Sequence, residues 1–208
     1  MHLQDIIQKM KNHEPTILGK EHYRTYSVLI PLVQKEGDIH LLFEIRSKTM
    51  RSQPGDVCFP GGKVDKSDLN EQYAALRETS EELGVEMNHV DDVFSLGCLI
   101  TEGRMIYPFV GTLLASDSIE VNENEVEAIF TVPLSYFLEA TPKKYPVYLK
   151  AAPSENFPYE LIQGGRAYQW KQQQIDELFY QYDGHVIWGL TAKIIAHFVS
   201  VLKGADSK

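Results

Sequence analysis

The stretch that decides this fold is Gly61–Val85, which reads GGKVDKSDLNEQYAALRETSEELGV. The Gly61-Gly62 pair predicts a tight turn that leads into a helix. We expect Asp68 to cap the start of that helix, with Glu71 reaching back to complete a capping box, and Gly84 to end it in a left-handed conformation. Four apolar residues recur at helical spacing and are expected to face a core: Leu69, Tyr73, Leu76 and Leu83. The segment is therefore predicted to be a loop, a helix and a stop.

The acidic residues of this helix fall where helix physics disfavours them. Glu78, Glu81 and Glu82 stand at i, i+3 and i+4, so their carboxylates share one face near the C-terminal end. Each like-charge pair costs about 0.2–0.5 kcal/mol, and the helix dipole adds about 0.3–1 kcal/mol for each anion there. The face is either a solvated acidic surface, partly neutralised by Arg77 through its i+4 partner Glu81, or a cation site. Oxygen ligands at this density suit Mg²⁺ or Mn²⁺, so a bound divalent ion would reverse the sign of these energies.

These residues resemble the signature of the Nudix hydrolases, G-x5-E-x7-R-E-U-x-E-E-x-G-U, in which U is a bulky aliphatic residue. Residues Arg77–Val85 match its second half, with Thr79 in place of one aliphatic residue. In the first half, Gly62 is followed after five residues by Asp68 rather than Glu, and eight residues rather than seven separate Asp68 from Arg77. The resemblance implies an α+β fold, a Nudix-like α/β/α sandwich with a mixed β-sheet and the loop–helix–loop motif at its centre.

A second motif lies upstream, in the stretch Leu42–Gly62, LFEIRSKTMRSQPGDVCFPGG. It is similar to the extra signature of the coenzyme A pyrophosphatase branch of the Nudix family, LLTxRSx3Rx3Gx3FPGGx2Dx2D. The chain departs from this pattern at Phe43-Glu44, where Leu-Thr is expected. The matching residues are Leu42, Arg46, Ser47, Arg51, Gly55, Phe59, Pro60, Gly61, Gly62, Asp65 and Asp68. This branch signature also has the extra residue found here between Asp68 and Arg77, which the general Nudix signature lacks.

The resemblance implies that Glu78, Glu81 and Glu82 hold a divalent metal ion, Mg²⁺ or Mn²⁺. It also implies a general base, and Glu81 and Glu125 are two candidates between which the sequence does not choose. Arg77 is better placed to orient the glutamates through an ion pair than to touch the substrate.

Two arginines and two glycines are the candidates for substrate binding. Arg46 and Arg51 flank a polar loop, where their guanidinium groups could engage phosphate in a bidentate manner. The alternative is that Arg46 only ends a strand and Arg51 is solvated. Gly61 and Gly62 would let backbone N–H groups approach phosphate closely, although such a pair more often marks a turn.

We therefore expect metal-dependent hydrolysis of the pyrophosphate bond of coenzyme A or a derivative. The family implies 3′,5′-ADP and 4′-phosphopantetheine, or an acyl-phosphopantetheine, as products. One alternative substrate is another nucleoside diphosphate derivative, such as ADP-ribose or a dinucleotide. A further alternative is a Nudix-fold binding module without turnover. Loss of the signature glutamates would mark such a module, and all three are present.

Composition agrees with a small-molecule enzyme. The chain has 208 residues, enough for a single domain, which we divide into a short N-terminal helix at 3–12, a core at about 25–140 and a C-terminal extension and helix at 141–203. The net charge of -9 argues against nucleic-acid and anionic-membrane partners. No signal peptide or membrane-spanning run is recognisable, so the expected location is cytoplasmic, and a homodimer is possible.

The rest of the pattern predicts mainly strands. We expect strands at 25–33, 39–46, 56–59, 93–100, 106–115, 126–132 and 186–189, a short helix at 133–138, and an irregular segment at 142–159 with strand fragments around 147–149. Cys58 and Cys98 are expected to be buried free thiols, since their apolar surroundings lack metal-ligand spacing.

Overall fold

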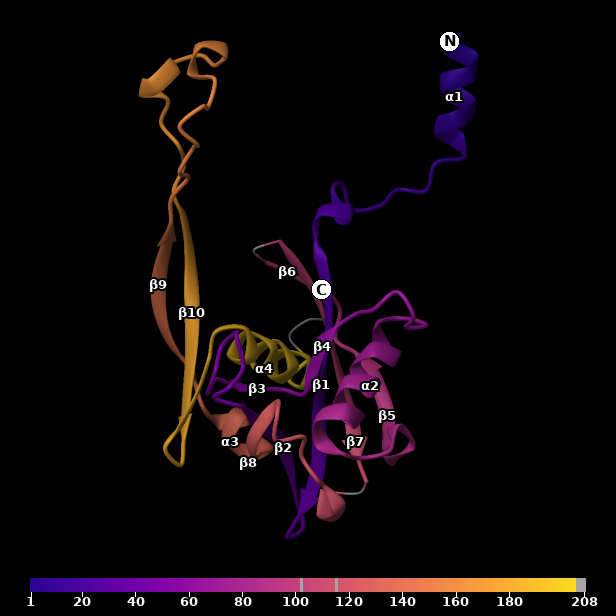
Figure 1. The fold of residues 1–208 in the computed structure, drawn as a ribbon, viewed down its shortest axis with the longest axis vertical. Coiled ribbons are helices and arrows are strands. Elements are labelled where there is room, and N and C mark those ends of the chain that lie inside the picture. Colours follow the sequence, from indigo (N-terminus) through magenta and orange to yellow (C-terminus); the bar gives the residue numbers. More distant parts are fainter. Residues whose placement is uncertain (102, 115, 205–208) are drawn as a thin grey trace.

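The computed structural model describes residues 1–101, 103–114 and 116–204, and its centre is a mixed β-sheet with helices on both faces (Figure 1). The main path of the sheet runs β3-β2-β1-β7-β5, while β4 pairs with β1, β6 with β7, and β8 with β2. The strands are β1 (Arg24–Lys35), β2 (Asp38–Arg46), β3 (Val57–Cys58), β4 (Gly61–Lys63), β5 (Val90–Ser95), β6 (Leu99–Thr101), β7 (Arg104–Leu113) and β8 (Val126–Pro133). The predicted mixed sheet between helices is confirmed.

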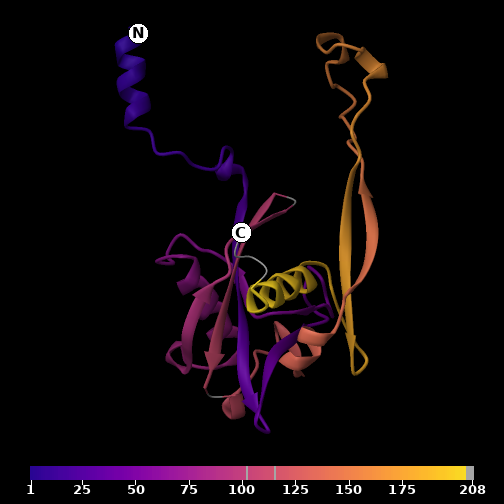
Figure 2. The same ribbon diagram turned by 180° about the vertical axis from the view of Figure 1, so that it is seen from behind.

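The helices cover opposite faces of this sheet because neighbouring residues of its central strands point to opposite sides. Leu29 of β1 packs in a cluster with Leu83 of α2, whereas the adjacent Ile30 packs in a second cluster with Phe137 of α3 and Phe198 of α4. The turned view in Figure 2 shows the same layers from behind. The helices are α1 (Leu3–Lys11), α2 (Glu71–Leu83), α3 (Leu134–Glu139) and α4 (Gly189–Leu202), with short 3-10 turns at η1 (Lys20–His22), η2 (Met87–His89), η3 (Ser116–Ser118), η4 (Tyr159–Leu161) and η5 (Gly165–Ala167).

The position of α2 follows from the one parallel pair in the sheet. β1 and β7 lie side by side in parallel, so the chain between them must cross over one face of the sheet. The chain between them contains β2, β3, β4, α2, η2, β5 and β6, and α2 is the helix that crosses the face. This crossover places α2 against β1 and β4. The prediction of a tight turn at Gly61-Gly62 is wrong, because both glycines belong to β4 and pair with Val28 and Ser27 of β1.

A second, antiparallel sheet projects from the core. It has the order β11-β10-β9, formed by β9 (Lys143–Leu149), β10 (Gln173–Tyr182) and β11 (His185–Trp188). In Figure 1 the β9–β10 hairpin extends well past the main sheet, and every residue of β9 is exposed. The strand fragments predicted around 147–149 are confirmed, but the strand is longer than expected, because pairing with the distant β10 orders all of β9.

The N-terminal helix is confirmed as α1, and it stands away from the sheet at the end of an extended segment (Figure 1). None of its residues is buried. Its exposed apolar side chains are Leu3, Ile6, Ile7 and Met10.

Several local predictions are corrected by the structure. The strand expected at 93–100 is two strands, β5 and β6, separated at Gly97, whose φ is 101°. The strand expected at 106–115 ends at Leu113, and its last residue lies outside the described residues. Both cysteines are free, but Cys98 is exposed rather than buried. No helix in the described part of the chain is both long and apolar enough to cross a membrane.

Candidate active site

The start of α2 differs from the prediction. Asn70, not Asp68, is the N-cap, and its Oδ1 accepts a hydrogen bond of 2.8 Å from the amide of Tyr73. Leu69 precedes the helix and is 83% exposed, so the expectation that it faces a core is also wrong. Gly84 ends the helix in the left-handed conformation with φ of 65°, as predicted.

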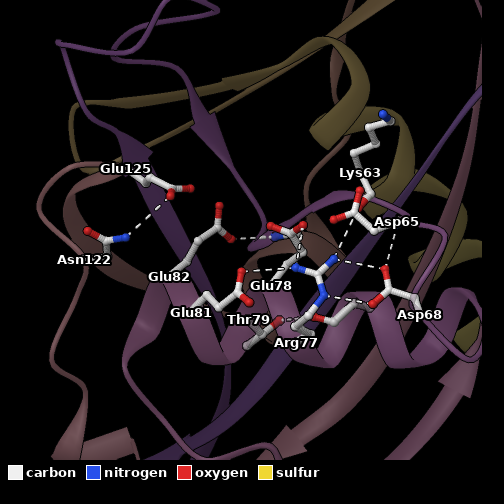
Figure 3. Close-up of polar contacts among 12 residues, drawn as sticks. Lys63, Asp65, Asp68, Arg77, Glu78, Thr79, Glu81, Glu82, Asn122 and Glu125 are labelled. Atoms are coloured by element: carbon white, nitrogen blue, oxygen red, sulfur yellow. Dashed lines mark hydrogen bonds and ion pairs between the residues drawn. The ribbon is translucent and has the colours of Figure 1, made fainter.

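Asp68 binds Arg77 instead of capping the helix. Its Oδ1 lies 2.9 Å from Nε of Arg77, and its Oδ2 lies 3.0 Å from Nη2, a bidentate pair. These hydrogen bonds lower the pKa of Asp68 and raise the pKa of Arg77. Nη1 of the same guanidinium lies 3.0 Å from Oε1 of Glu78 and 3.1 Å from Oε2 of Glu81 (Figure 3). Arg77 therefore connects the loop to two of the three helix glutamates.

The two glycines of β4 are in direct contact with two of the helix glutamates. The amide of Gly61 donates a hydrogen bond of 2.7 Å to Oε2 of Glu82. A Cβ at Gly62 would lie 2.4 Å from the carboxylate carbon of Glu78, so a larger residue would displace that group. The two glycines of β4 thus leave the space that the helix carboxylates occupy.

The three helix glutamates share a side of α2 but differ in burial (Figure 3). The side chain of Glu82 is buried, that of Glu78 is 17% exposed and that of Glu81 is 58% exposed. Burial, followed by the neighbouring Glu44 carboxylate, raises the pKa of Glu82 from 4.5 to about 9. Burial also raises the pKa of Glu78, against the opposing effect of Arg77.

Thr79 replaces an aliphatic residue of the signature without leaving a polar group unpaired. Its side chain is fully buried, and its hydroxyl donates a hydrogen bond of 2.7 Å to the carbonyl oxygen of Ala75.

Glu125 reaches the same region from the loop before β8. Figure 3 shows its side chain beside that of Glu82. Its Oε1 lies 3.5 Å from Nδ2 of Asn122, and its carbonyl oxygen accepts a hydrogen bond of 2.8 Å from the amide of Ser47. The amide of Asn122 in turn donates to the carbonyl oxygen of Glu82 at 2.9 Å. This loop is therefore tied to both β2 and the end of α2.

Glu44 is a fourth carboxylate that sequence reasoning did not place in the site. It lies in β2 with 1% of its surface exposed, and its Oε1 accepts a hydrogen bond of 3.2 Å from Sγ of Cys58. Burial raises the pKa of Glu44 from 4.5 to about 7, and the charges of Glu78 and Glu125 contribute in the same direction. The sequence did contain a signal that could have identified Glu44: it is an acidic residue within an apolar strand, at a position where the similar motif has Thr.

The two candidate arginines lie in different surroundings. Arg46 lines a cleft of about 440 Å³ and donates a hydrogen bond of 3.4 Å from Nε to the carbonyl oxygen of Ser52. Arg51 is exposed on the loop and does not line that cleft. The rest of the lining comes from the loop before β3, from β3, β6, β7, β10 and β11, and from the start of α4, and it includes Cys58, Ile100, Arg104, Ile175, Trp188 and Lys193. Neither this cleft nor a smaller hollow of about 270 Å³ between β7 and α4 is lined by the three helix glutamates, Glu125 or Glu44.

The carboxylates suit a hard divalent cation. They supply only oxygen atoms, and the Oε2 atom of Glu44 is buried without a hydrogen-bond partner in the described residues. Among those residues, no three acidic, histidine or cysteine side chains already form a complete ligand set. Any bound cation would therefore draw ligands together or complete its shell with water and substrate oxygens.

Comparisons with known proteins agree with this geometry. A model of the NUDIX domain matches residues 23–151. The chain is 40% identical over 114 residues to peroxisomal coenzyme A diphosphatase NUDT7 of Mus musculus, which covers 54% of this chain and 48% of that protein. It is 31% identical over 195 residues to the uncharacterized Nudix hydrolase NudL of Pectobacterium atrosepticum, covering 93% and 91%. The chain thus spans about half of the mouse protein and most of the bacterial one.

A solved structure shows the same fold. The MutT/nudix family protein from Enterococcus faecalis superposes with a TM-score of 0.51 at 11% identity, over 98% of this chain and 70% of that chain.

Proposed function

Because the chain belongs to the NUDIX domain family of hydrolases, we propose that it hydrolyses the pyrophosphate bond of coenzyme A or one of its derivatives. The observation that carries this proposal is the packing of Glu78 and Glu82 against Gly61 and Gly62 of β4, at the end of the motif that contains Arg46. The name of the mouse relative supports the choice of coenzyme A. The products would be 3′,5′-ADP and 4′-phosphopantetheine or its acyl form.

Nudix hydrolases generally use divalent metal ions, and Mg²⁺ or Mn²⁺ is the ion we propose here. Glu78, Glu81 and Glu82 would hold it. When bound, the ion would supply charge neutralisation at the phosphate oxygens and a more acidic attacking water. Arg77 would keep Glu78 and Glu81 oriented, since it contacts both carboxylates and is itself fixed by Asp68.

Glu81 and Glu125 remain the candidates for the general base. One oxygen of Glu81 is occupied by the Arg77 guanidinium, whereas Glu125 contacts the neutral amide of Asn122. This difference favours Glu125 as the proton acceptor. The pH dependence of kcat in Glu81→Gln and Glu125→Gln tests the choice, because loss of the base removes the acidic limb of the profile.

The cleft beside Arg46 is the part of the surface best suited to a nucleotide with additional phosphate. Arg46, Arg104 and Lys193 bring positive charge to the cleft, although Asp56 also lines it and Lys193 is paired with Glu177 at 2.8 Å. We propose Arg46 as the phosphate-binding arginine. Arg51 would bind phosphate only if its loop moved inward.

The experiment measures product release from coenzyme A and from 3′-dephospho-coenzyme A with Mg²⁺ or Mn²⁺. We expect metal-dependent cleavage that prefers the 3′-phosphate. Arg46→Ala should lower kcat/KM for coenzyme A by about 10- to 100-fold, with a smaller effect for Arg51→Ala as the matched control. Equal cleavage of both substrates would retain the hydrolase and reject phosphate recognition by Arg46.

Cleavage of neither compound would direct the assay to ADP-ribose and dinucleotides. Failure with every pyrophosphate tested would favour a binding module without turnover.

A homodimer and a cytoplasmic location stay predictions. The uncovered apolar side chains of α1 and of the β9–β10 hairpin support a second copy as partner. Light scattering on the full chain, whose mass is 23.7 kDa, decides between one and two copies.

A further inference from the structure

Glu44 is a buried acid whose hydrogen bonding is incomplete. It lies near the C-terminal end of β2, between Phe43 and Ile45, and pairs with Cys58 across the β2–β3 ladder. The thiol of Cys58 is a weak donor, and it reaches only Oε1, at 3.2 Å. Within the described part of the chain, Oε2 has no partner. A buried carboxylate oxygen in this condition is unfavourable unless a cation or a proton accompanies it.

The groups around Glu44 are mostly of the same charge. Glu78 and Glu82 approach from α2, and Glu125 approaches from the loop before β8. Arg46 is the cation two residues along the same strand, and its guanidinium is turned toward the carbonyl oxygen of Ser52 and the cleft. Acids from α2 and from the loop before β8 therefore influence Glu44, the acid contributed by the sheet, although no three acidic, histidine or cysteine side chains among the described residues are already grouped as metal ligands.

The position of Glu44 is rigid. Its strand is paired on one side with β3 and on the other with β8, where Glu44 lies opposite Ile129. Buried Phe43 precedes it on the opposite face of the sheet, among the rings of Phe59 and Phe137. The backbone therefore cannot carry the carboxylate to solvent without disrupting the core.

We propose that Glu44 is a further ligand of the divalent cation, binding through Oε2 from the sheet side of the site. This inference rests on the proposed function, since it concerns the same metal. The cation supplies the missing partner of Oε2 and neutralises the repulsion between Glu44 and Glu82. The thiol of Cys58 holds Oε1, which leaves Oε2 as the oxygen directed at the metal.

The competing explanation is structural. Glu44 and Glu82 would share a proton, and Glu44 would only accept the hydrogen bond from Cys58. Glu44→Gln separates the two explanations because glutamine keeps an acceptor for the thiol and the same volume, but has lost the anionic oxygen.

The test measures Mn²⁺ binding by calorimetry and by electron paramagnetic resonance, without substrate. We compare the wild type with Glu44→Gln and with Glu139→Gln, which removes one charge from the exposed end of α3. Glu44→Gln should weaken Mn²⁺ binding by about 10- to 100-fold and reduce the rise in Tm on adding Mn²⁺. The Tm of the metal-free variant should not fall, and Glu139→Gln should bind Mn²⁺ as the wild type does.

Unchanged Mn²⁺ affinity in Glu44→Gln would overturn the inference while leaving the proposed hydrolase intact. Absence of Mn²⁺ and Mg²⁺ binding by the wild type would instead overturn the metal-dependent function on which it rests. If Glu44→Gln did not fold, Mn²⁺ affinity would be measured in Glu44→Thr instead, because Thr occupies this position in the similar motif. Wild-type affinity in Glu44→Thr would equally reject Glu44 as a ligand.

Discussion

The amide of Gly61 donates a 2.7 Å hydrogen bond to Oε2 of Glu82, which connects strand β4 to the last turn of α2. The bond uses one oxygen of a buried carboxylate and leaves the other available. Gly62, the next residue, leaves room for the carboxylate of Glu78. The glycine pair and the helix glutamates thus form one structural unit.

Gly62→Ala should damage activity more than stability. Its Cβ would meet the mobile end of Glu78 at 2.4 Å, so we expect the carboxylate to move and kcat/KM to fall about 100-fold. Gly111→Ala is the matched control, because its Cβ would meet only apolar side chains, at 3.0 Å or more. The control should lower stability by about 1–3 kcal/mol and leave kcat unchanged. Equal activity in the two variants would reject the proposed role of Gly62.

Glu82→Gln should abolish turnover without unfolding the protein. Since the raised pKa of Glu82 keeps it largely protonated in the metal-free protein near pH 7, the neutral amide resembles the group it replaces. We expect kcat to fall by about 10²–10⁴-fold and the metal-free Tm to stay level or rise. Steady-state assays and thermal denaturation in EDTA measure both. Retained turnover would exclude Glu82 from the metal site.

The metal-free protein should lose stability as the pH rises. Glutamate ordinarily has a pKa of 4.5, whereas Glu44 and Glu82 titrate near 7 and 9 in the folded state. Between the ordinary pKa of 4.5 and these raised values, the folded chain retains protons that the unfolded chain has released. The free energy of unfolding therefore decreases as the pH rises. Tm in EDTA should therefore fall between pH 5 and pH 9, which are about the limits of this window.

The variants and the metal provide the controls for this pH dependence. Glu82→Gln should flatten the slope of Tm against pH. Excess Mn²⁺ should raise Tm most at the alkaline end, because binding favours the ionised carboxylates. A Tm that rises with pH in EDTA would contradict the prediction.

Asp68→Asn should weaken the contacts that hold the Arg77 guanidinium in place. The substitution replaces a bidentate carboxylate with an amide that can accept at only one atom, so Glu78 and Glu81 lose part of their orientation. We expect kcat to fall about tenfold, which is the usual size of such supporting effects. Asp91→Asn on the exposed side of β5 removes the same charge and should have no effect. A normal kcat in Asp68→Asn would show that Arg77 needs no such anchor.

Asn70→Ala should destabilise the fold with little change in kcat. It removes the acceptor for the amide of Tyr73, a loss of about 0.5–2 kcal/mol at a helix N-cap. Chemical denaturation measures the loss. If Asp68→Asn lowered stability and Asn70→Ala did not, the cap would belong to Asp68 after all.

The sequence by itself determined the features that depend on neighbouring residues. The spacing of Glu78, Glu81 and Glu82 places them on one side of any helix, and Gly84 can end that helix because glycine accepts a positive φ. The β1–β2 hairpin was predictable for the same reason, since its two strands and its turn are continuous in sequence.

Only the tertiary structure decided which distant groups meet. Asp68 looked like a helix cap because the local pattern contains no information about where the Arg77 side chain lies. Glu44 entered the site because β2 lies next to β1, against which α2 packs. Arg51 stayed outside because its side chain is exposed and does not line the cleft. Local spacing fixes the direction of a side chain on its own element, whereas burial and unpaired charge arise from the packing of elements far apart in the chain.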